Sequence, residues 1–103
     1  MASLDITISK RHADLSEALA AATRQKISRL DRFGQGMERA EVHFSEAKNP
    51  RILDRETCEV FLDGHGQRLR CKVVGPDGFV AVDRAVAKLE HQLHKLKTRN
   101  TAR

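Results

Sequence analysis

The chain has 103 residues, of which 40% are hydrophobic and 32% are charged, and its formal net charge is +5. This length suits a single domain over residues 1–103, and the composition excludes wholesale disorder. No apolar run approaches the roughly 18 residues that a membrane span needs, and residues 1–5 do not have the features of a signal peptide, so we expect a cytoplasmic protein that does not contact membranes.

The N-terminal third of the chain predicts a strand followed by a helix. Hydrophobic and polar residues alternate over 4–8, which is typical of a half-buried strand. Ser16 is a candidate N-cap, and Glu17 is a first-turn acid that favours the helix dipole. One helical face then collects Leu19, Ala22, Thr23, Ile27, Leu30 and Phe33. Gly34 and Gly36 predict the end of this helix, because glycine adopts the left-handed conformation that closes helices.

The middle of the chain predicts three strands. Alternating hydrophobic residues place them over 40–45, 58–62 and 69–73. The sequence DGHG at 63–66 favours a hairpin turn between the last two. The expected register across this turn pairs Leu62 with Gln67, which places Glu59 opposite Arg70 and Cys58 opposite Cys71, and the opposite charges of the first pair support it. A slip of two residues keeps the same side chains on each face, so the slipped register is the alternative.

The C-terminal third predicts the clearest helix. It follows a turn at 75–78, with Asp77 as a possible cap. Its apolar stripe steps by three and four through Phe79, Val82, Val86, Leu89, Leu93 and Leu96. A polar tail over 98–103 is expected to fray. The predicted architecture is an α+β fold of order β-α-β-β-β-α, in which a four-stranded sheet carries both helices on one face and the first two strands are parallel if they are neighbours.

Basic residues are concentrated near the C-terminus. Residues 84–103 contain six Lys or Arg and one acid, which accounts for the whole positive excess. Opposite the apolar stripe, the second helix presents a row that we call the basic strip: Arg84, Lys88, His91, Lys95 and Arg99. On the first helix, Lys26, Arg29 and Arg32 recur every three residues. Together they predict a surface that binds RNA phosphates and recognises shape; ordinary solvated helix faces are the alternative.

Other chemistries find little support in the sequence. Four Phe and no Trp or Tyr argue against a base-stacking sheet like that of RNA-recognition motifs. His91 and His94 lack the spacing of a metal motif, and Cys58 and Cys71 favour buried free thiols over metal ligands. No glycine-rich phosphate loop or nucleophile elbow is present. We therefore expect neither an enzyme nor a metal, cofactor or small-molecule substrate.

Two segments resemble the short ribosome hibernation promoting factors, also called ribosome-associated inhibitors or sigma-54 modulation proteins. The resemblance is carried by DGFVAVD at 77–83 and KLEHQLHK at 88–95, with support from LSEAL at 15–19 and KISRL at 26–30. It implies a β-α-β-β-β-α domain that lodges on the small ribosomal subunit, between head and body over the decoding region, and contacts 16S rRNA. By position, the contacts would be Lys26, Arg29, Arg32, Lys88, His91 and Lys95, and we add Arg84, Lys97 and Arg99 from the same basic stretch.

The resemblance also implies a steric mechanism, in which the occupied site excludes mRNA and tRNA and translation idles reversibly. Two departures stand out. The family often has arginine where this chain has His91, so the charge there depends on pH. The chain stops at Arg103 without the dimerisation domain of long members, so we expect a monomer off the ribosome that does not pair ribosomes by itself. The alternatives are a generic double-stranded RNA-binding module, which the leading strand disfavours, and a protein-interaction regulator of transcription.

Overall fold

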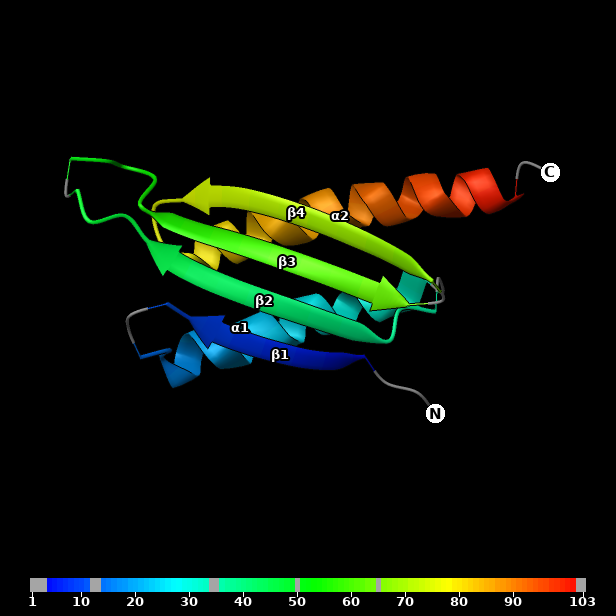
Figure 1. The fold of residues 1–103 in the computed structure, drawn as a ribbon, viewed down its shortest axis with the longest axis horizontal. Coiled ribbons are helices and arrows are strands. Elements are labelled where there is room, and N and C mark those ends of the chain that lie inside the picture. The colour runs from blue at the N-terminus through cyan, green and yellow to red at the C-terminus, as the bar shows by residue number, and fades with distance from the viewer. Residues whose placement is uncertain (1–3, 12–13, 34–35, 50, 65, 102–103) are drawn as a thin grey trace.

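The computed structural model contains one four-stranded sheet with both helices on the same face (Figure 1). It describes residues 4–11, 14–33, 36–49, 51–64 and 66–101, without the side chains of 32–33 and 97–101. The strands are β1 (Asp5–Lys10), β2 (Arg39–Glu46), β3 (Glu56–Gly64) and β4 (Gln67–Gly75). The helices are α1 (Glu17–Ser28), which continues as a 3₁₀ turn (Arg29–Phe33), and α2 (Gly78–Thr101). The predicted α+β class and element order are confirmed.

The strands lie in the order β1-β2-β3-β4. β1 and β2, which flank the crossover helix α1, pair in parallel as predicted, and the other two pairs are antiparallel. α1 packs behind β1 and α2 packs behind β3 and β4 (Figure 1). The opposite face of the sheet, which we call the open face, is left to solvent. Neither helix, over its described residues, combines the length and the hydrophobicity that would span a membrane.

The start of α1 follows the prediction, and its end does not. Ser16 caps the helix, because its hydroxyl oxygen accepts a hydrogen bond from the Leu19 N–H at 3.1 Å. The buried members of the predicted face are Leu19, Thr23, Ile27 and Leu30, whereas Ala22 is half-buried. The regular helix ends at Ser28, and the next residues tighten into the 3₁₀ turn, a frequent way for a helix to terminate. The side chain of Phe33 lies outside the described residues.

Two glycines allow the chain to enter β2 closely beside the end of β3. Gly36 has a φ of +68°, in the left-handed region predicted for a glycine stop, whereas Gly34 lies outside the described residues. The carbonyl of Gly36 lies against Gly64, where a Cβ atom would come within 2.4 Å of that oxygen. A side chain at either position would therefore disturb this crossing.

The β3–β4 hairpin has a tighter turn than its sequence suggested. Gly64 pairs with Gln67, and the loop comprises only residues 65–66. Leu62 consequently pairs with Leu69, so the pairing of Leu62 with Gln67 was wrong and the alternative register, two residues away, is the one present. Gly66 provides the positive φ that such a short turn needs, at +75°. His65 lies outside the described residues.

The two-residue slip changes the cross-strand partners without changing the faces. Glu59 faces Lys72 and not Arg70, although Arg70 still reaches it diagonally, with 2.6 Å between Nη2 and Oε2. Cys58 and Cys71 are likewise offset along the ladder and do not face each other. Both cysteines remain on the buried face, as free thiols. The predicted burial of the thiols is thus confirmed, whereas the direct pairings in both cases are wrong.

α2 supplies much of the hydrophobic core. Asp77 caps the helix, because its Oδ1 accepts a hydrogen bond from the Val80 N–H at 2.9 Å. The side chains of α2 that are fully buried belong to Ala81, Val82, Ala85, Leu89 and Leu93. Phe79, predicted to begin the buried stripe, is 43% exposed. The face that the fold buries includes Ala81 and Ala85 instead, and Gly75 lets the helix approach β4 there, since a Cβ atom on Gly75 would lie 2.9 Å from the Ala81 nitrogen.

The helix extends beyond its apolar stripe, to Thr101. The side chains of Lys97 and Arg99 and the whole of residues 102–103 lie outside the described part of the chain. The frayed tail over 98–103 therefore stays a prediction.

Candidate nucleic-acid interface

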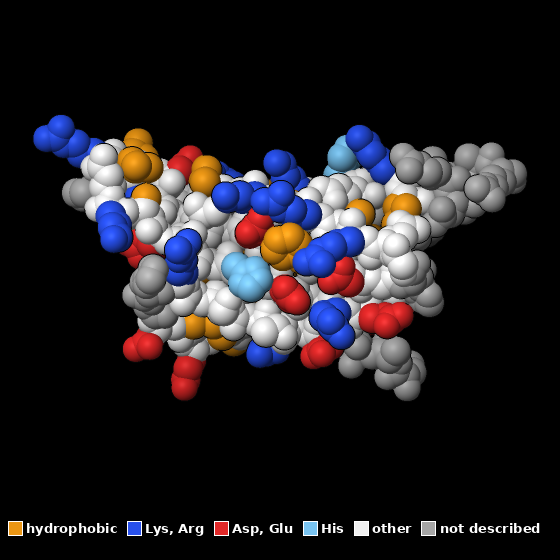
Figure 2. All heavy atoms as spheres, viewed as in Figure 1, with side chains coloured by type: hydrophobic (Ala, Val, Ile, Leu, Met, Phe, Trp, Pro, Cys, Tyr) orange, Lys and Arg blue, Asp and Glu red, His pale blue; other side chains and the backbone are white. Residues whose placement is uncertain are grey.

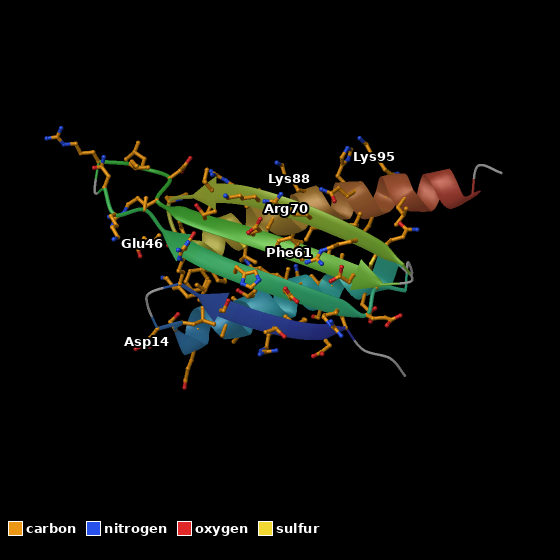
Figure 3. The ribbon with its side chains drawn as sticks, in the orientation of Figure 1. Asp14, Glu46, Phe61, Arg70, Lys88 and Lys95 are labelled. Carbon is orange, nitrogen blue, oxygen red and sulfur yellow. The ribbon has the colours of Figure 1, made fainter. Side chains whose placement is uncertain are left out.

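The described members of the basic strip share one exposed side of α2, because they recur every three or four residues along the helix. They are Arg84, Lys88, His91 and Lys95. Lys88 and Lys95 extend beyond the β4 edge of the sheet, where they are visible from the open face (Figure 3). The strip therefore lies beside β4 and is separated from α1 by the body of α2.

The members of the strip differ in how far the fold already uses them. Arg84 donates a hydrogen bond through Nη1 to the Val74 carbonyl at 2.7 Å, and the same atom lies 3.7 Å from Asp54 Oδ2. Lys88, His91 and Lys95 form no hydrogen bond or ion pair with any other described residue. These three side chains are the ones free to bind an external anion.

Sequence analysis missed a second set of cations, on β4. Arg68, Arg70 and Lys72 alternate along this strand and point to the open face. Arg70 binds Glu59, and Arg68 Nε lies 3.5 Å from Asp63 Oδ1. The signal is present in the sequence as a period-two row of basic residues in QRLRCK, at 67–72, which coincides with the hydrophobic alternation of the strand.

A shallow pocket joins the strip to β4. It is lined by Arg70, Cys71, Lys72, Ala87, Lys88, His91 and Gln92, so it contains several basic groups and no acid. Gln92 Nε2 donates to the Arg70 carbonyl at 3.3 Å, and Arg84 binds the Val74 carbonyl, so α2 satisfies two outward carbonyls of the β4 edge. These bonds fix the helix against the strand. The charge of the pocket suits an anion such as a phosphate.

The charged side chains of the open face are also unevenly distributed (Figure 2). Lys and Arg side chains gather over β4 and along the margin beyond it, whereas the half of the face over β1 and β2 mixes acids with bases. The basic surface thus runs from α2 onto β4.

The cations of α1 have a different setting from those of α2. Lys26 forms an ion pair with Asp83 of α2, and the two side chains are 26% and 60% exposed. Arg29 is exposed on the 3₁₀ turn, and the side chain of Arg32 lies outside the described residues. Lys26 is therefore already paired within the protein, whereas the sequence suggested a row of free cations on α1.

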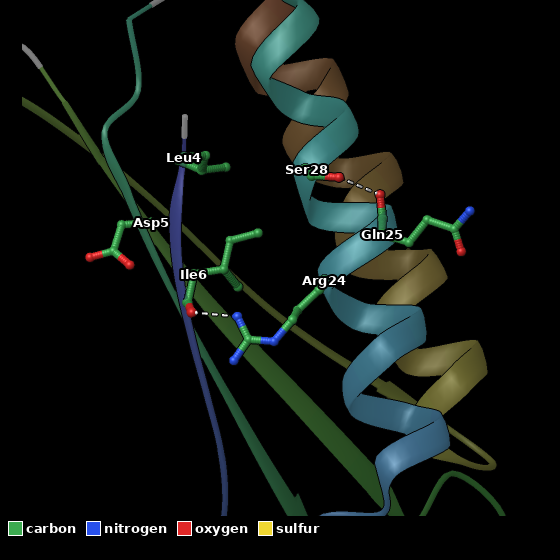
Figure 4. Close-up of a pocket in the computed structure, with 6 residues that line it drawn as sticks. All are labelled: Leu4, Asp5, Ile6, Arg24, Gln25 and Ser28. Atoms are coloured by element: carbon green, nitrogen blue, oxygen red, sulfur yellow. Dashed lines mark hydrogen bonds between the residues drawn. The ribbon is translucent and has the colours of Figure 1, made fainter. Parts of the chain in front are cut away.

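The β1 edge has a pocket of its own, between β1 and α1 (Figure 4). It is lined by Leu4, Asp5, Ile6, Arg24, Gln25 and Ser28. Arg24 Nη1 donates to the Ile6 carbonyl at 2.9 Å, and Ser28 Oγ donates to the Gln25 carbonyl at 2.8 Å. The cation of this pocket is thus already bound to the strand, and Asp5 adds a negative charge.

The cysteines do not form a reactive site. Burial raises the pKa of Cys58 to about 12, with smaller contributions from Cys71 and Glu56, and burial also raises the pKa of Cys71. The thiolate, which is the nucleophile and the metal ligand, is therefore disfavoured at both positions. No three His, Cys, Asp or Glu side chains gather to hold a metal ion within the described ranges.

Comparisons with known proteins identify a family for this fold. A family model described as sigma 54 modulation protein / S30EA ribosomal protein matches residues 6–101. A ribosome hibernation promotion factor from Deinococcus radiodurans is 32% identical over 92 residues, which cover 89% of this chain and 48% of that protein. The chain thus spans about half the length of that curated relative.

Two solved structures share the fold. The N-terminal domain of Protein Y from Thermus thermophilus superposes with a TM-score of 0.73 at 26% identity, covering 91% of this chain and 98% of that one. A ribosomal subunit interface protein from Coxiella burnetii superposes with a TM-score of 0.80 at 22% identity, with the same coverage of 91% and 98%.

Proposed function

The chain belongs to the sigma 54 modulation protein / S30EA ribosomal protein family, and from this membership and its basic surface we propose that it is a ribosome hibernation factor. In this proposal it binds 16S rRNA in the decoding channel of the small subunit and excludes mRNA and tRNA sterically, which inhibits translation reversibly and needs no catalytic group. The observation that carries the proposal is the acid-free row of uncommitted cations beside β4.

The proposed contacts follow from which side chains of the basic strip are free. Lys88, His91 and Lys95 are the primary ones, because they form no hydrogen bond or ion pair with another described residue. Lys88 and Lys95 are separated by about 10 Å along the helix at about 1.5 Å per residue, a span over which a helix side can follow several phosphates. The further contacts that we propose from the family resemblance are Lys26, Arg29, Arg32, Arg84, Lys97 and Arg99.

Shape and charge also bear on the alternatives. A double-stranded RNA-binding module has no strand before its first helix, whereas β1 precedes α1 here and completes the sheet beside β2. A protein-interaction regulator of transcription would be expected to bind through an apolar surface. The basic surface described above favours a polyanion, and we propose that residues 1–103 act as one ribosome-binding domain, monomeric off the ribosome and located in the cytoplasm.

Co-sedimentation with purified small ribosomal subunits over a range of salt concentrations tests the proposal. We expect comigration at low salt that fades steeply as the salt concentration rises. Binding to phosphates releases their counterions, and a high salt concentration opposes that release. Absence of comigration at low salt would contradict the proposal and direct attention to protein partners. Comigration that does not respond to salt would indicate an apolar protein contact.

A pair of charge-reversed variants locates the interface. Lys88→Glu with Lys95→Glu should abolish comigration while leaving the fold intact, because both side chains are exposed and unpaired. The matched control is Lys48→Glu with Arg51→Glu, which makes the same change of charge in the exposed β2–β3 loop. Equal losses in the two variants would mean that net charge alone matters, and no loss in the first would mean that the strip is only a solvated face.

A further inference from the structure

One aromatic side chain stands on the open face of the sheet. β3 turns Thr57, Glu59, Phe61 and Asp63 toward this face, so Phe61 is the apolar member of a polar row. It breaks the alternation of its strand, since both of its neighbours, Val60 and Leu62, are fully buried on the other face. The core therefore does not account for this ring.

The ring of Phe61 is surrounded by three planar groups. Arg68 places its guanidinium carbon 4.6 Å from the ring centroid, and that of Arg70 lies 5.8 Å away. The imidazole of His43 meets the ring edge-on, with 6.0 Å between centroids. Two guanidinium groups and two rings thus form a single cluster, which we call the Phe61 cluster: His43, Phe61, Arg68 and Arg70.

Acidic residues on either side of the ring hold the arginines in place. Arg70 Nε donates to Glu59 Oε2 at 2.7 Å, and Asp63 lies within 3.5 Å of Arg68 Nε. The arginines keep more than half of their side-chain surface exposed, at 58% for Arg68 and 59% for Arg70. The planar groups are therefore ordered before any ligand arrives and still face solvent, which lowers the entropic cost of binding.

The acids also decide what kind of ligand suits the cluster. Because Glu59 and Asp63 offset the charges of Arg70 and Arg68, the cluster offers little net attraction to a phosphate. Flat π-surfaces and carboxylate acceptors suit a nucleobase, which stacks through its face and donates hydrogen bonds through its amino groups.

The cluster is continuous with the basic surface beside α2. Arg70 belongs to the cluster and also lines the pocket that contains Lys72, Lys88 and His91. Figure 3 shows Phe61 and Arg70 on the sheet next to the edge beyond which Lys88 extends. A strand of RNA whose phosphates follow the uncommitted cations can therefore place an adjacent base over the cluster.

We propose that the Phe61 cluster is a stacking subsite for an unpaired RNA base, adjoining the phosphate-binding strip. This inference rests on the proposed function, because it needs RNA at the strip, and it adds the class of RNA that is bound: a helical segment next to an unpaired nucleotide. The base contact is sequence-tolerant, since every base has a π-face. Phe61, Arg68 and His43 are the binding residues that it adds.

The test compares two fluorescently labelled RNA hairpins of the same stem, one blunt and one with a single-stranded overhang, by anisotropy titration. The wild-type chain should prefer the overhang. Phe61→Leu, which keeps an apolar side chain and removes the ring, should weaken binding of the overhang hairpin by about 5- to 150-fold, the range that corresponds to loss of one stacked base. Binding of the blunt hairpin, and the salt dependence of both, should stay unchanged, because no phosphate contact is lost.

Two further variants keep the result interpretable. Phe61→Tyr retains the ring and should restore the preference for the overhang. If the ring only stabilised the sheet, the preference for the overhang would not depend on it. Val74→Ala shortens another exposed apolar side chain on the open face of β4, 45% exposed, and should have no effect. Thermal denaturation verifies that each variant is folded.

The outcomes separate this inference from the proposed function. Equal binding of both hairpins by the wild-type chain, or an overhang preference that survives Phe61→Leu, would overturn the stacking subsite while small subunits still comigrate. Loss of comigration with small subunits in the wild-type chain would overturn the proposed function itself. An overhang preference that is lost in Phe61→Leu and restored in Phe61→Tyr supports the subsite.

Discussion

The two edges of the sheet, β1 with α1 and β4 with α2, use similar basic side chains in different ways. At the β1 edge, Arg24 is bound to the Ile6 carbonyl and Lys26 is paired with Asp83. At the β4 edge, Arg84 and Gln92 bind the strand, whereas Lys88, His91 and Lys95 form no hydrogen bond or ion pair with another described residue. A basic side chain is thus fully available to a phosphate only where the fold has not already used its charge.

Both edges rest on one hydrophobic core, and α2 contributes several of its fully buried side chains. This arrangement fixes the strip relative to β4, because a helix that is anchored by buried leucines cannot rotate its polar side away. The free energy that holds α2 in place is thus a condition for the interface, although no core residue touches the ligand.

The largest expected effect comes from breaking that anchorage. Leu89→Ala removes a side chain with no exposed surface and should lower the free energy of unfolding by roughly 2–5 kcal/mol. Chemical denaturation followed by circular dichroism measures it. Leu53→Ala, at a position that is 87% exposed, is the control and should change stability by less than about 0.5 kcal/mol. Equally small losses in the free energy of unfolding of the two variants would mean that buried side chains do not hold α2 in place. The basic strip would then not be fixed relative to β4.

A pair of single neutralisations then tests the comparison directly. Lys88→Ala should reduce the slope of log affinity against log salt by about one, as expected for one lost phosphate contact. Lys26→Ala should reduce it by less, because Asp83 already offsets the charge of Lys26. Salt titrations of small-subunit binding provide both slopes. A larger loss for Lys26 would show that α1, and not the β4 edge, carries the phosphate contacts.

Features of the fold that depend on residues close together in the sequence could be predicted, whereas features that depend on contacts between distant segments could not. Element order, the caps at Ser16 and Asp77, and the buried alternation of the strands follow from local patterns, and all are present. The hairpin register did not follow, because a slip of two residues preserves the faces and the turn length alone decides between the registers. Phe79 was misplaced because the buried face of α2 includes Ala81 and Ala85, which the steps between large apolar residues did not reveal.

The interface shows the same limit. The basic strip could be placed on the exposed side of α2 from its spacing, and that placement is confirmed for its described members. The ion pair that occupies Lys26 joins residues 57 positions apart, so no local pattern revealed it. The Phe61 cluster combines β2, β3 and β4, so it depends on pairing between strands that no local pattern contains.

The smallest expected effect comes from freeing Lys26 from its ion pair with Asp83. Asp83→Asn removes the partner of Lys26 and should lower the free energy of unfolding by only about 0.2–1 kcal/mol, because the pair is partly exposed and solvent screens it. The same change should make small-subunit binding stronger and slightly more salt-dependent, since Lys26 becomes available to a phosphate. Asp14→Asn, which removes the same charge at an exposed position just before α1 (Figure 3), is the control for net charge. If both variants gain affinity equally, the gain reflects total charge; if only Asp83→Asn gains, the ion pair is what weakens the contact of Lys26 with phosphate.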